Sequence, residues 1–304
     1  MINEKEKIVK INELSREIQK EILKNCGVAI RFIDNPDKEL QLLAVNQNGL
    51  ALTFINNPDK EVQLEAVKED GRAIQFIENP DKELQLIAIK QNFVSIQFIK
   101  NPVKEVQLIS VRKHGGSIEY IKNPDKDVQL EALKEDGRAI EFIENPDKEL
   151  QLAAVRSYGS SIKFIKNPDK DIQLAAVNKY PFSINFIENP DKDVQLAAVR
   201  KCGNSIRFIN NPDKDIQLLA LKEDCSSIKF IDNPNKAISD RIKIYKTYQR
   251  DLIAFKDDDG NYKFSIGCQR NISKESFLWR IYNLDGGLEA NPHRQEYLDI
   301  LKQY

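Results

Sequence analysis

The chain has 304 residues, of which 41% are hydrophobic and 31% are charged, a composition typical of a folded, water-soluble protein. Its 46 basic and 47 acidic residues give a formal net charge of −1, and no long segment carries charge of mainly one sign. Phosphate binding usually needs a basic face and a DNA mimic would be acidic, so the overall charge supports neither class of protein.

Cysteine and histidine are too few and too scattered for a structural zinc site. Only two histidines occur, and no C-x-x-C pair is formed by the four cysteines, Cys26, Cys202, Cys225 and Cys268. The start "MINEKEKIVK" is charged, and no long apolar run follows it. We therefore expect a cytoplasmic protein with no metal, no cofactor and no membrane span.

The first segment is predicted to be a helix. Residues 4–24 hold Ile8, Ile11, Ile18 and Ile22 among charged residues, which indicates one apolar face. We expect residues 1–27 to form an N-terminal capping helix.

The middle of the chain is a repeat. Ten prolines, each preceded by asparagine, recur every 22 residues from Pro36 to Pro234. A fixed period of this length indicates a repeat architecture in which each unit packs on its neighbours. The predicted fold is mainly α: an α-solenoid of ten 22-residue two-helix repeats over residues 28–250, followed by a small α+β C-terminal appendage.

One unit, "NPDKDVQLAAVRKCGNSIRFIN", illustrates the expected elements. Asn189 is predicted to be the N-cap and Pro190 the first residue of a longer helix, which Gly203 ends. Ser205 is predicted to cap a second, shorter helix, 3₁₀ in part.

A strand over the Ile-x-Phe-Ile segment, as in a leucine-rich horseshoe, remains an alternative. The adjacent apolar residues Phe208 and Ile209 break a strand alternation, whereas a helical turn places Ile206 and Ile209 on one side. The pattern favours the helix.

A glutamine occupies the same place in nine units, inside the apolar stripe of the longer helix. We predict that its amide bonds to backbone groups of the Asn-Pro turn or of the neighbouring unit, because a buried amide without a partner is costly. The nine residues are Gln41, Gln63, Gln85, Gln107, Gln129, Gln151, Gln173, Gln195 and Gln217.

The repeat decays after Pro234. Ile238, Ile242 and Tyr245 keep one apolar face, which predicts a C-terminal capping helix.

Residues 251–304 are predicted to form a small ββαα domain, either a docked cap or a separate recognition module. "LIAFKDDDGNYKFSIG" alternates around a turn and indicates a hairpin. Ser273 is expected to cap the next helix, and Asn291-Pro292 to start a last one with Tyr297, Leu298 and Leu301 on its apolar face.

Two segments resemble known families. The unit "NPDKEVQLEAVKEDGRAIQFI" resembles an uncharacterised helical repeat of bacterial, phage and giant-virus proteins, with the pattern x-N-P-x-x-x-V-Q-L-x-A-V followed by I-x-x-I, and looks broadly like variant leucine-rich and HEAT-like solenoids. This resemblance covers residues 28–246. The tail "YKFSIGCQRNISKESFLWRIY" resembles a small domain that ends some phage repeat proteins, although Gln269 interrupts its G-C-R motif. The first resemblance implies a fold and a binding surface, and it implies no reaction.

No nucleotide-binding, metalloprotease or serine-hydrolase motif occurs, so we expect no enzymatic activity. "KEDGR" occurs twice beside a glutamate, and these two acidic clusters are expected to be solvated surface rather than cation sites.

The positions that vary between units are the candidate binding residues. The site between Ile and Phe of the short helix changes from neutral to acidic to basic along the chain, which suits protein recognition. From Arg31, Thr53 and Gln75 it continues through Gln97, Glu119, Glu141, Lys163, Asn185, Arg207 and Lys229. A second candidate cluster at the inter-helix turns consists of Arg156, Tyr158, Tyr180 and Phe182.

These observations predict a non-enzymatic scaffold or adaptor that binds a partner protein through its variable surface, in a phage or bacterial host-interaction or anti-defence setting. The alternative is nucleic-acid or nucleotide binding along the concave face of the solenoid, which the overall charge does not support.

Overall fold

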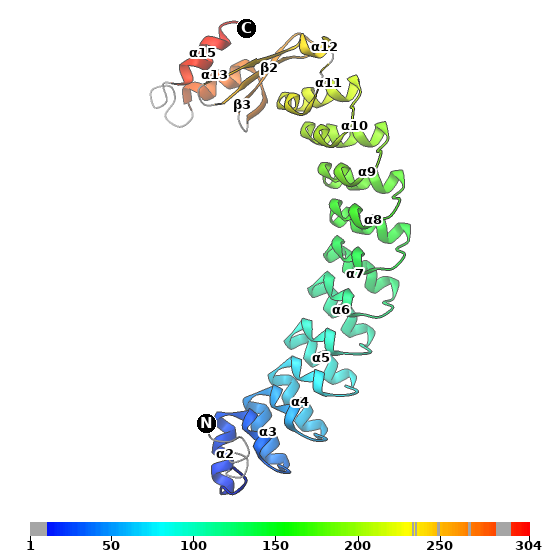
Figure 1. Ribbon diagram of the computed structural model, residues 1–304, viewed down its shortest axis with the longest axis vertical. Coiled ribbons are helices and arrows are strands. Elements are labelled where there is room, and N and C mark those ends of the chain that lie inside the picture. The colour runs from blue at the N-terminus through cyan, green and yellow to red at the C-terminus, as the bar shows by residue number, and fades with distance from the viewer. Residues whose placement is uncertain (1–10, 233, 235, 248–249, 267–268, 284–292) are drawn as a thin grey trace. The chain divides into compact units, whose positions relative to one another are not determined.

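A computed structural model describes residues 11–232, 234, 236–247, 250–266, 269–283 and 293–304 of the protein (Figure 1). The chain divides into two compact units, Met1–Ala153 and Ala154–Tyr304. No helix in the described ranges is both long enough and apolar enough to cross a bilayer.

Both units are built from pairs of one ten-residue α helix and one six-residue 3₁₀ helix. The α helices are α2 Arg16–Asn25, α3 Lys38–Gln47, α4 Lys60–Glu69, α5 Lys82–Gln91, α6 Lys104–Lys113, α7 Lys126–Glu135, α8 Lys148–Ser157, α9 Lys170–Lys179, α10 Lys192–Lys201 and α11 Lys214–Glu223. The 3₁₀ helices are η1 Gly27–Phe32, η2 Gly49–Phe54, η3 Gly71–Phe76, η4 Phe93–Phe98, η5 Gly115–Tyr120, η6 Gly137–Phe142, η7 Gly159–Phe164, η8 Pro181–Phe186, η9 Gly203–Phe208 and η10 Cys225–Phe230. The predicted repeat of two helices is confirmed, and the strand alternative is wrong because those segments are 3₁₀ helices.

The start of the α helix lies two residues later than predicted. In α10 the N-cap is Asp191, whose Oδ1 accepts a hydrogen bond from the Val194 amide at 3.2 Å. Asn189 takes a left-handed backbone with φ of 47° and Pro190 precedes the helix. The prediction for Asn189 and Pro190 is therefore wrong. Asparagine tolerates the left-handed region better than most residues, and a carboxylate suits the positive helix end.

The start of the 3₁₀ helix also differs from the prediction. Gly203 is its first residue rather than the stop of α10, and Ser205 is buried inside it rather than capping it. A Cβ on Gly203 would lie 2.5 Å from the Ala220 carbonyl oxygen of the next repeat. Glycine therefore allows consecutive repeats to approach closely at this point.

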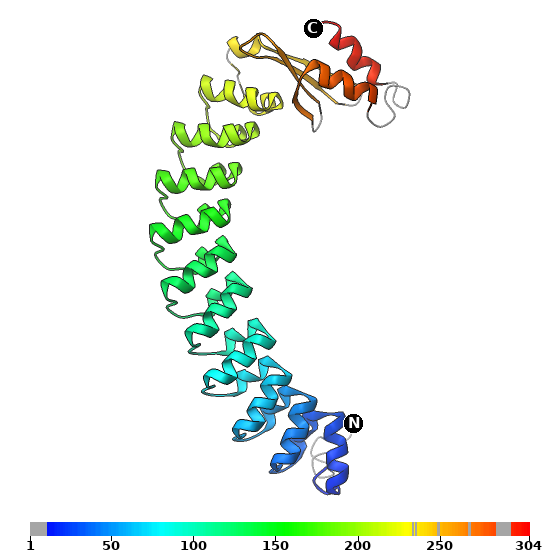
Figure 2. The ribbon, with the colours of Figure 1, turned by 180° about the vertical axis from the view of Figure 1, so that it is seen from behind.

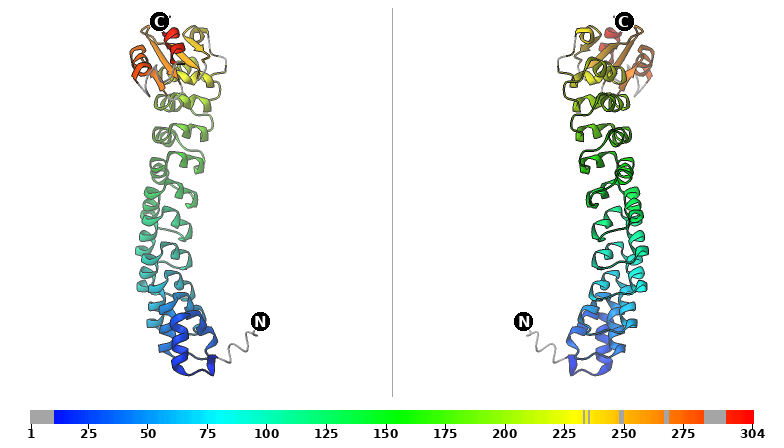
Figure 3. Two further views of the ribbon diagram at one scale, coloured as in Figure 1. Left: turned by 90° about the vertical axis from the view of Figure 1, so that its left-hand side faces the viewer. Right: turned by 90° about the vertical axis from the view of Figure 1, so that its right-hand side faces the viewer.

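The core lies between two layers of helices. Within each unit, consecutive α helices contact one another, as do consecutive 3₁₀ helices, and α helices pack on their own 3₁₀ helices, as α4 does on η3 and α10 on η9 (Figures 2 and 3). In α4 and η3 the buried side chains are those of Val62, Ala66, Val67, Ala73 and Ile74, and the same positions are buried in most repeats of each unit. Each repeat thus buries its apolar surface mainly against neighbouring repeats, as stacked repeats do.

The predicted glutamine row is confirmed. All nine glutamine Nε2 atoms donate to the carbonyl oxygen of the proline in their own Asn-Pro turn, at 2.7–3.0 Å. Gln85 Oε1 also accepts from the Val103 amide of the next repeat at 3.0 Å. The row therefore fixes the turn that begins each helix, which is a structural role.

Exposed ion pairs link neighbouring repeats at the helix N-termini. Lys60 Nζ lies 2.8 Å from Asp81 and 3.2 Å from Glu83 of the next repeat. We call the equivalent contacts the lysine ladder, and its lysines are Lys38, Lys60, Lys82, Lys104 and Lys126 in the first unit and Lys170 and Lys192 in the second.

Within the described residues, the predicted N-terminal helix is interrupted between Asn12 and Arg16. A helical turn over Ile11–Asn12 ends, and α2 begins at Arg16 after Ser15 at the N-cap. Serine favours such a break because it favours the N-cap position over the helix interior. Ile8 lies outside the described residues.

The C-terminal part of the second unit contains a four-stranded antiparallel sheet in the order β1-β2-β3-β4. Its strands are β1 Ile242–Tyr245, β2 Leu252–Lys256, β3 Tyr262–Ile266 and β4 Gln269–Ile272, followed by α13 Lys274–Asn283 and α15 Arg294–Leu301. The predicted hairpin and the cap at Ser273, whose Oγ accepts from the Ser276 amide at 3.2 Å, are confirmed. The predicted start of the last helix at Asn291-Pro292 lies outside the described residues.

The expected capping helix after Pro234 is wrong. The helix α12 covers only Lys236–Ser239, and Ile242 and Tyr245 belong to strand β1, paired with Phe255 and Leu252 of β2. Among the described residues the appendage therefore contains four strands and two helices instead of a ββαα arrangement, and β1 replaces the expected helix because pairing with β2 outweighs the helical pattern of a short segment.

The two faces of the sheet have different partners. Leu252, Ala254 and Phe264 pack against α13 and α15. On the other face, Ser265 Oγ accepts from Cys225 Sγ of η10 at 3.0 Å. The sheet thus covers the last 3₁₀ helix of the second unit.

Candidate binding surface

A row of partly exposed aromatic side chains marks the 3₁₀ helices. Each 3₁₀ helix ends in an aromatic residue; six of these are 38–43% exposed and the others half-buried. We call these ten residues the aromatic row: Phe32, Phe54, Phe76, Phe98, Tyr120, Phe142, Phe164, Phe186, Phe208 and Phe230.

The 3₁₀ geometry explains their exposure. With three residues per turn, residues three apart in sequence share a face. Ile74 and Ile77 therefore share the side that packs inward, with Ile74 fully buried, and Phe76 is turned away from it at 39% exposure. The sequence alone did not predict this row, because binding was expected only at the positions that vary between units, and the aromatic residue is nearly constant.

The variable row lies directly beside the aromatic row. All ten of its residues are exposed, as expected for a recognition position. In the first unit these are Arg31, Thr53, Gln75, Gln97, Glu119 and Glu141; in the second they are Lys163, Asn185, Arg207 and Lys229. We call the two rows together, within each unit, the binding strip.

In the second unit basic side chains lie over the aromatic rings. Lys163 Nζ is 4.5 Å from the Phe164 ring centroid. The Arg207 guanidinium is 4.6 Å from the Phe208 centroid and 5.6 Å from that of Phe230 in the next repeat. These cation–π contacts hold the charged heads at the strip surface.

Part of the second predicted cluster joins the strip. Tyr180, 44% exposed, contacts Phe182 edge-on with centroids 5.5 Å apart, and Phe182 contacts Phe208 at 5.7 Å. Tyr158 is exposed at the equivalent turn one repeat earlier. Arg156 is exposed in the last turn of α8, and no ring contact involves it within the described ranges.

Grooves run between consecutive repeats along the strip. One in the first unit, of about 390 Å³, is lined by Gln75, Phe76 and Phe98. One in the second, of about 600 Å³, is lined by Asn185, Arg207 and Phe208. Variable-row and aromatic-row residues thus share the walls of the same grooves.

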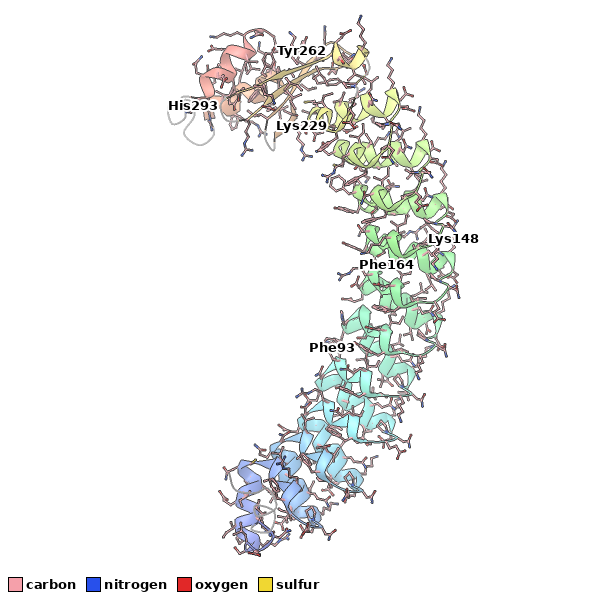
Figure 4. All side chains as sticks on the ribbon, in the orientation of Figure 1. Phe93, Lys148, Phe164, Lys229, Tyr262 and His293 are labelled. Atoms are coloured by element: carbon pink, nitrogen blue, oxygen red, sulfur yellow. The ribbon has the colours of Figure 1, made fainter. Side chains whose placement is uncertain are left out.

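The side chains divide by type between the faces of the repeats. Phe93, Phe164 and Lys229 project from the 3₁₀ helices, and Lys148 projects from the N-terminal turn of its α helix (Figure 4). The aromatic rings therefore gather on the 3₁₀ side and the lysine ladder on the α side.

The other polar clusters are internally compensated. Lys68 pairs with Glu65 at 2.6 Å, and Lys134 and Arg112 pair with Glu131 at 2.6 and 3.0 Å. The Lys134 ammonium, and then Arg112, lower the pKa of Glu131. No group of three or more potential metal ligands gathers among the described residues.

A family model described as a domain of unknown function (DUF4116) matches residues 59–102, a span of two repeats. No curated protein and no solved structure matches the chain significantly. The match agrees with the repeat boundaries and carries no function.

Proposed function

We propose that the protein is a non-enzymatic scaffold or adaptor that binds a partner protein through its binding strip. The observation that carries this proposal is the aromatic row, in which every repeat exposes part of an aromatic ring beside a variable polar residue. Exposed apolar groups at a regular spacing are not needed for folding, and aromatic residues are enriched at protein interfaces.

The chemistry of the strip suits protein recognition. Aromatic rings supply contact area with little conformational entropy to lose, and the variable row supplies charge that selects among partners. The cluster of Tyr180, Phe182 and Phe208 resembles an interface hot spot with Arg207 at its rim. The resemblance to phage and bacterial repeat proteins supports a host protein as the partner.

The test is affinity capture followed by a binary binding measurement. Wild type, Tyr180→Ala and Glu141→Lys would be used as baits, with Lys148→Ala on the α side as the control. A partner that binds wild type and the control should bind Tyr180→Ala with at least tenfold lower affinity, as expected when a central interface anchor is removed. A partner retained by all variants would refute the role of the strip.

Nucleic-acid binding is a second candidate, favoured mainly by the second unit. There Lys163, Arg207 and Lys229 lie beside aromatic residues, the combination that proteins use for single strands. Binding to a fluorescent oligonucleotide that weakens steeply with salt and with Arg207→Gln would support it. A partner protein whose capture tolerates salt favours the first proposal.

A further inference from the structure

The strongest single feature of the first unit is a pocket of about 410 Å³ lined by residues of η4, η5 and η6. Its walls include Phe93, Tyr120 and Phe142, together with Glu119 and Glu141. Tyr120 and Phe142 are 43% and 42% exposed, so their rings are available to a ligand.

The pocket carries uncompensated negative charge. Arg138 forms a two-pronged pair with Asp136, with Nε to Oδ1 at 3.0 Å and Nη2 to Oδ2 at 2.8 Å, so these charges cancel. His114 packs edge-on against Phe93, with centroids 5.8 Å apart. Within the described ranges, Glu119 and Glu141 have no ion pair. The pocket therefore keeps the negative charge of these two carboxylates, which lie beside the exposed rings of Tyr120 and Phe142.

We propose that this pocket binds an arginine side chain from a basic, extended segment of the partner protein, an inference that rests on the proposed function. A guanidinium can stack on an aromatic face while its N–H groups donate to carboxylates, and this pocket offers both in adjacent repeats. A lysine would provide a point charge without the planar stack, so it would bind less tightly.

The geometry also explains why adjacent repeats are needed. Glu119 with Tyr120 comes from η5, and Glu141 with Phe142 comes from η6, and these two 3₁₀ helices contact each other. The equivalent positions in η7, η9 and η10 of the second unit are Lys163, Arg207 and Lys229, which would repel the same ligand. The arginine site is therefore specific to these two repeats.

The test uses the full chain and a fluorescein-labelled peptide of alternating arginine and serine, with blocked ends. Matched peptides would carry lysine, or neutral citrulline, in place of arginine. Fluorescence anisotropy at low salt should show binding in the order arginine, lysine, citrulline. The variant Glu119→Gln/Glu141→Gln should weaken arginine-peptide binding about tenfold or more.

Two further variants separate the pocket from general attraction. Glu144→Gln removes an exposed carboxylate of the same repeat outside the pocket, and should weaken binding less than about twofold. Tyr120→Leu/Phe142→Leu should reduce the preference for arginine over lysine. Equal affinity of the double glutamine variant and wild type, or an equal loss with Glu144→Gln, would overturn the inference. The proposed function would then still stand or fall separately, on partner capture by Tyr180→Ala in the second unit.

Discussion

The third residue of every 3₁₀ helix is buried against neighbouring repeats, and it is always alanine or serine. In Ser95, Ser161, Ser183 and Ser205 the hydroxyl has no hydrogen-bond partner among the described residues. Ser227, at the same position, donates to Asn204 Oδ1 at 3.1 Å. Equivalent residues of different repeats therefore include buried hydroxyl groups with a hydrogen-bond partner and buried hydroxyl groups without one.

Replacing Ser205 with alanine should raise the free energy of unfolding by about 0.5–1 kcal/mol, because it removes a buried polar group that has no partner. The matched change Ser227→Ala should lower it by about 1 kcal/mol, because it breaks a hydrogen bond. Urea unfolding monitored by circular dichroism would measure both. If both substitutions changed the free energy of unfolding in the same direction, Ser205 and Ser227 would not differ in hydrogen bonding as described.

Residue-level prediction from the sequence succeeded where one interaction dominated. The glutamine row was predictable because an amide in an apolar stripe must find backbone partners, and Gln63 does so at Pro58. The N-cap residue was not predictable, because asparagine and aspartate are both good N-caps. Asp191 rather than Asn189 takes this position because Asn189 adopts a left-handed backbone. Composition alone does not distinguish these two residues.

At the scale of elements, one asparagine of β4 makes two of the hydrogen bonds between the sheet and the last repeat. Asn271 Oδ1 accepts from the Cys225 amide at 2.9 Å, and its Nδ2 donates to the Lys222 carbonyl at 2.7 Å. Its φ of 47° is left-handed. Asn271 therefore joins β4 to both α11 and η10.

Asn271→Gly should lower the free energy of unfolding by about 2 kcal/mol, since it removes two hydrogen bonds while keeping the left-handed backbone accessible. Asn271→Ala should cost about 1 kcal/mol more, because it adds backbone strain. Chemical unfolding, with hydrogen exchange of β4 amides as a local readout, would measure this. Wild-type stability in the glycine variant would show that the contact is not needed.

The elements that repeat were predictable, and those that occur once were less so. The 22-residue period located each helix pair, since ten copies average out local ambiguity. The exposure of the aromatic row was not predicted, because binding was expected only where residues vary, whereas the 3₁₀ spacing turns Phe76 away from the face of Ile74 and Ile77. Strand β1 was missed because its four residues fit either pattern and tertiary pairing decides.

At the scale of the whole molecule, the lysine ladder recurs in both units. Lys60 lowers the pKa of Asp81 through a charged hydrogen bond, with a further contribution from the Leu84 amide. A carboxyl group whose pKa is lower in the folded state stabilises the fold above its unfolded pKa. That stability is lost as the pH falls through the folded pKa. Acid should therefore weaken the junctions between repeats.

The Tm of wild type should fall between about pH 5 and pH 2, and Lys60→Met should show a shallower fall, because Asp81 then loses its main partner. Lys100→Met is the control, since Lys100 is exposed and has no ion pair within the described ranges. Thermal melts at low salt would measure the difference, and high salt should reduce it. Identical pH profiles for the two variants would exclude the ladder as a source of acid sensitivity.

The aromatic row and the variable row differ in how freely evolution can alter them. Phe or Tyr stays at the end of each 3₁₀ helix, while the exposed residue before it is neutral, acidic or basic in different repeats. A substitution at Glu119 or Lys163 would change the charge of the proposed binding strip without disturbing any buried contact. New specificities can therefore arise one codon at a time on an unchanged framework, and duplication of a repeat adds another independently adjustable position.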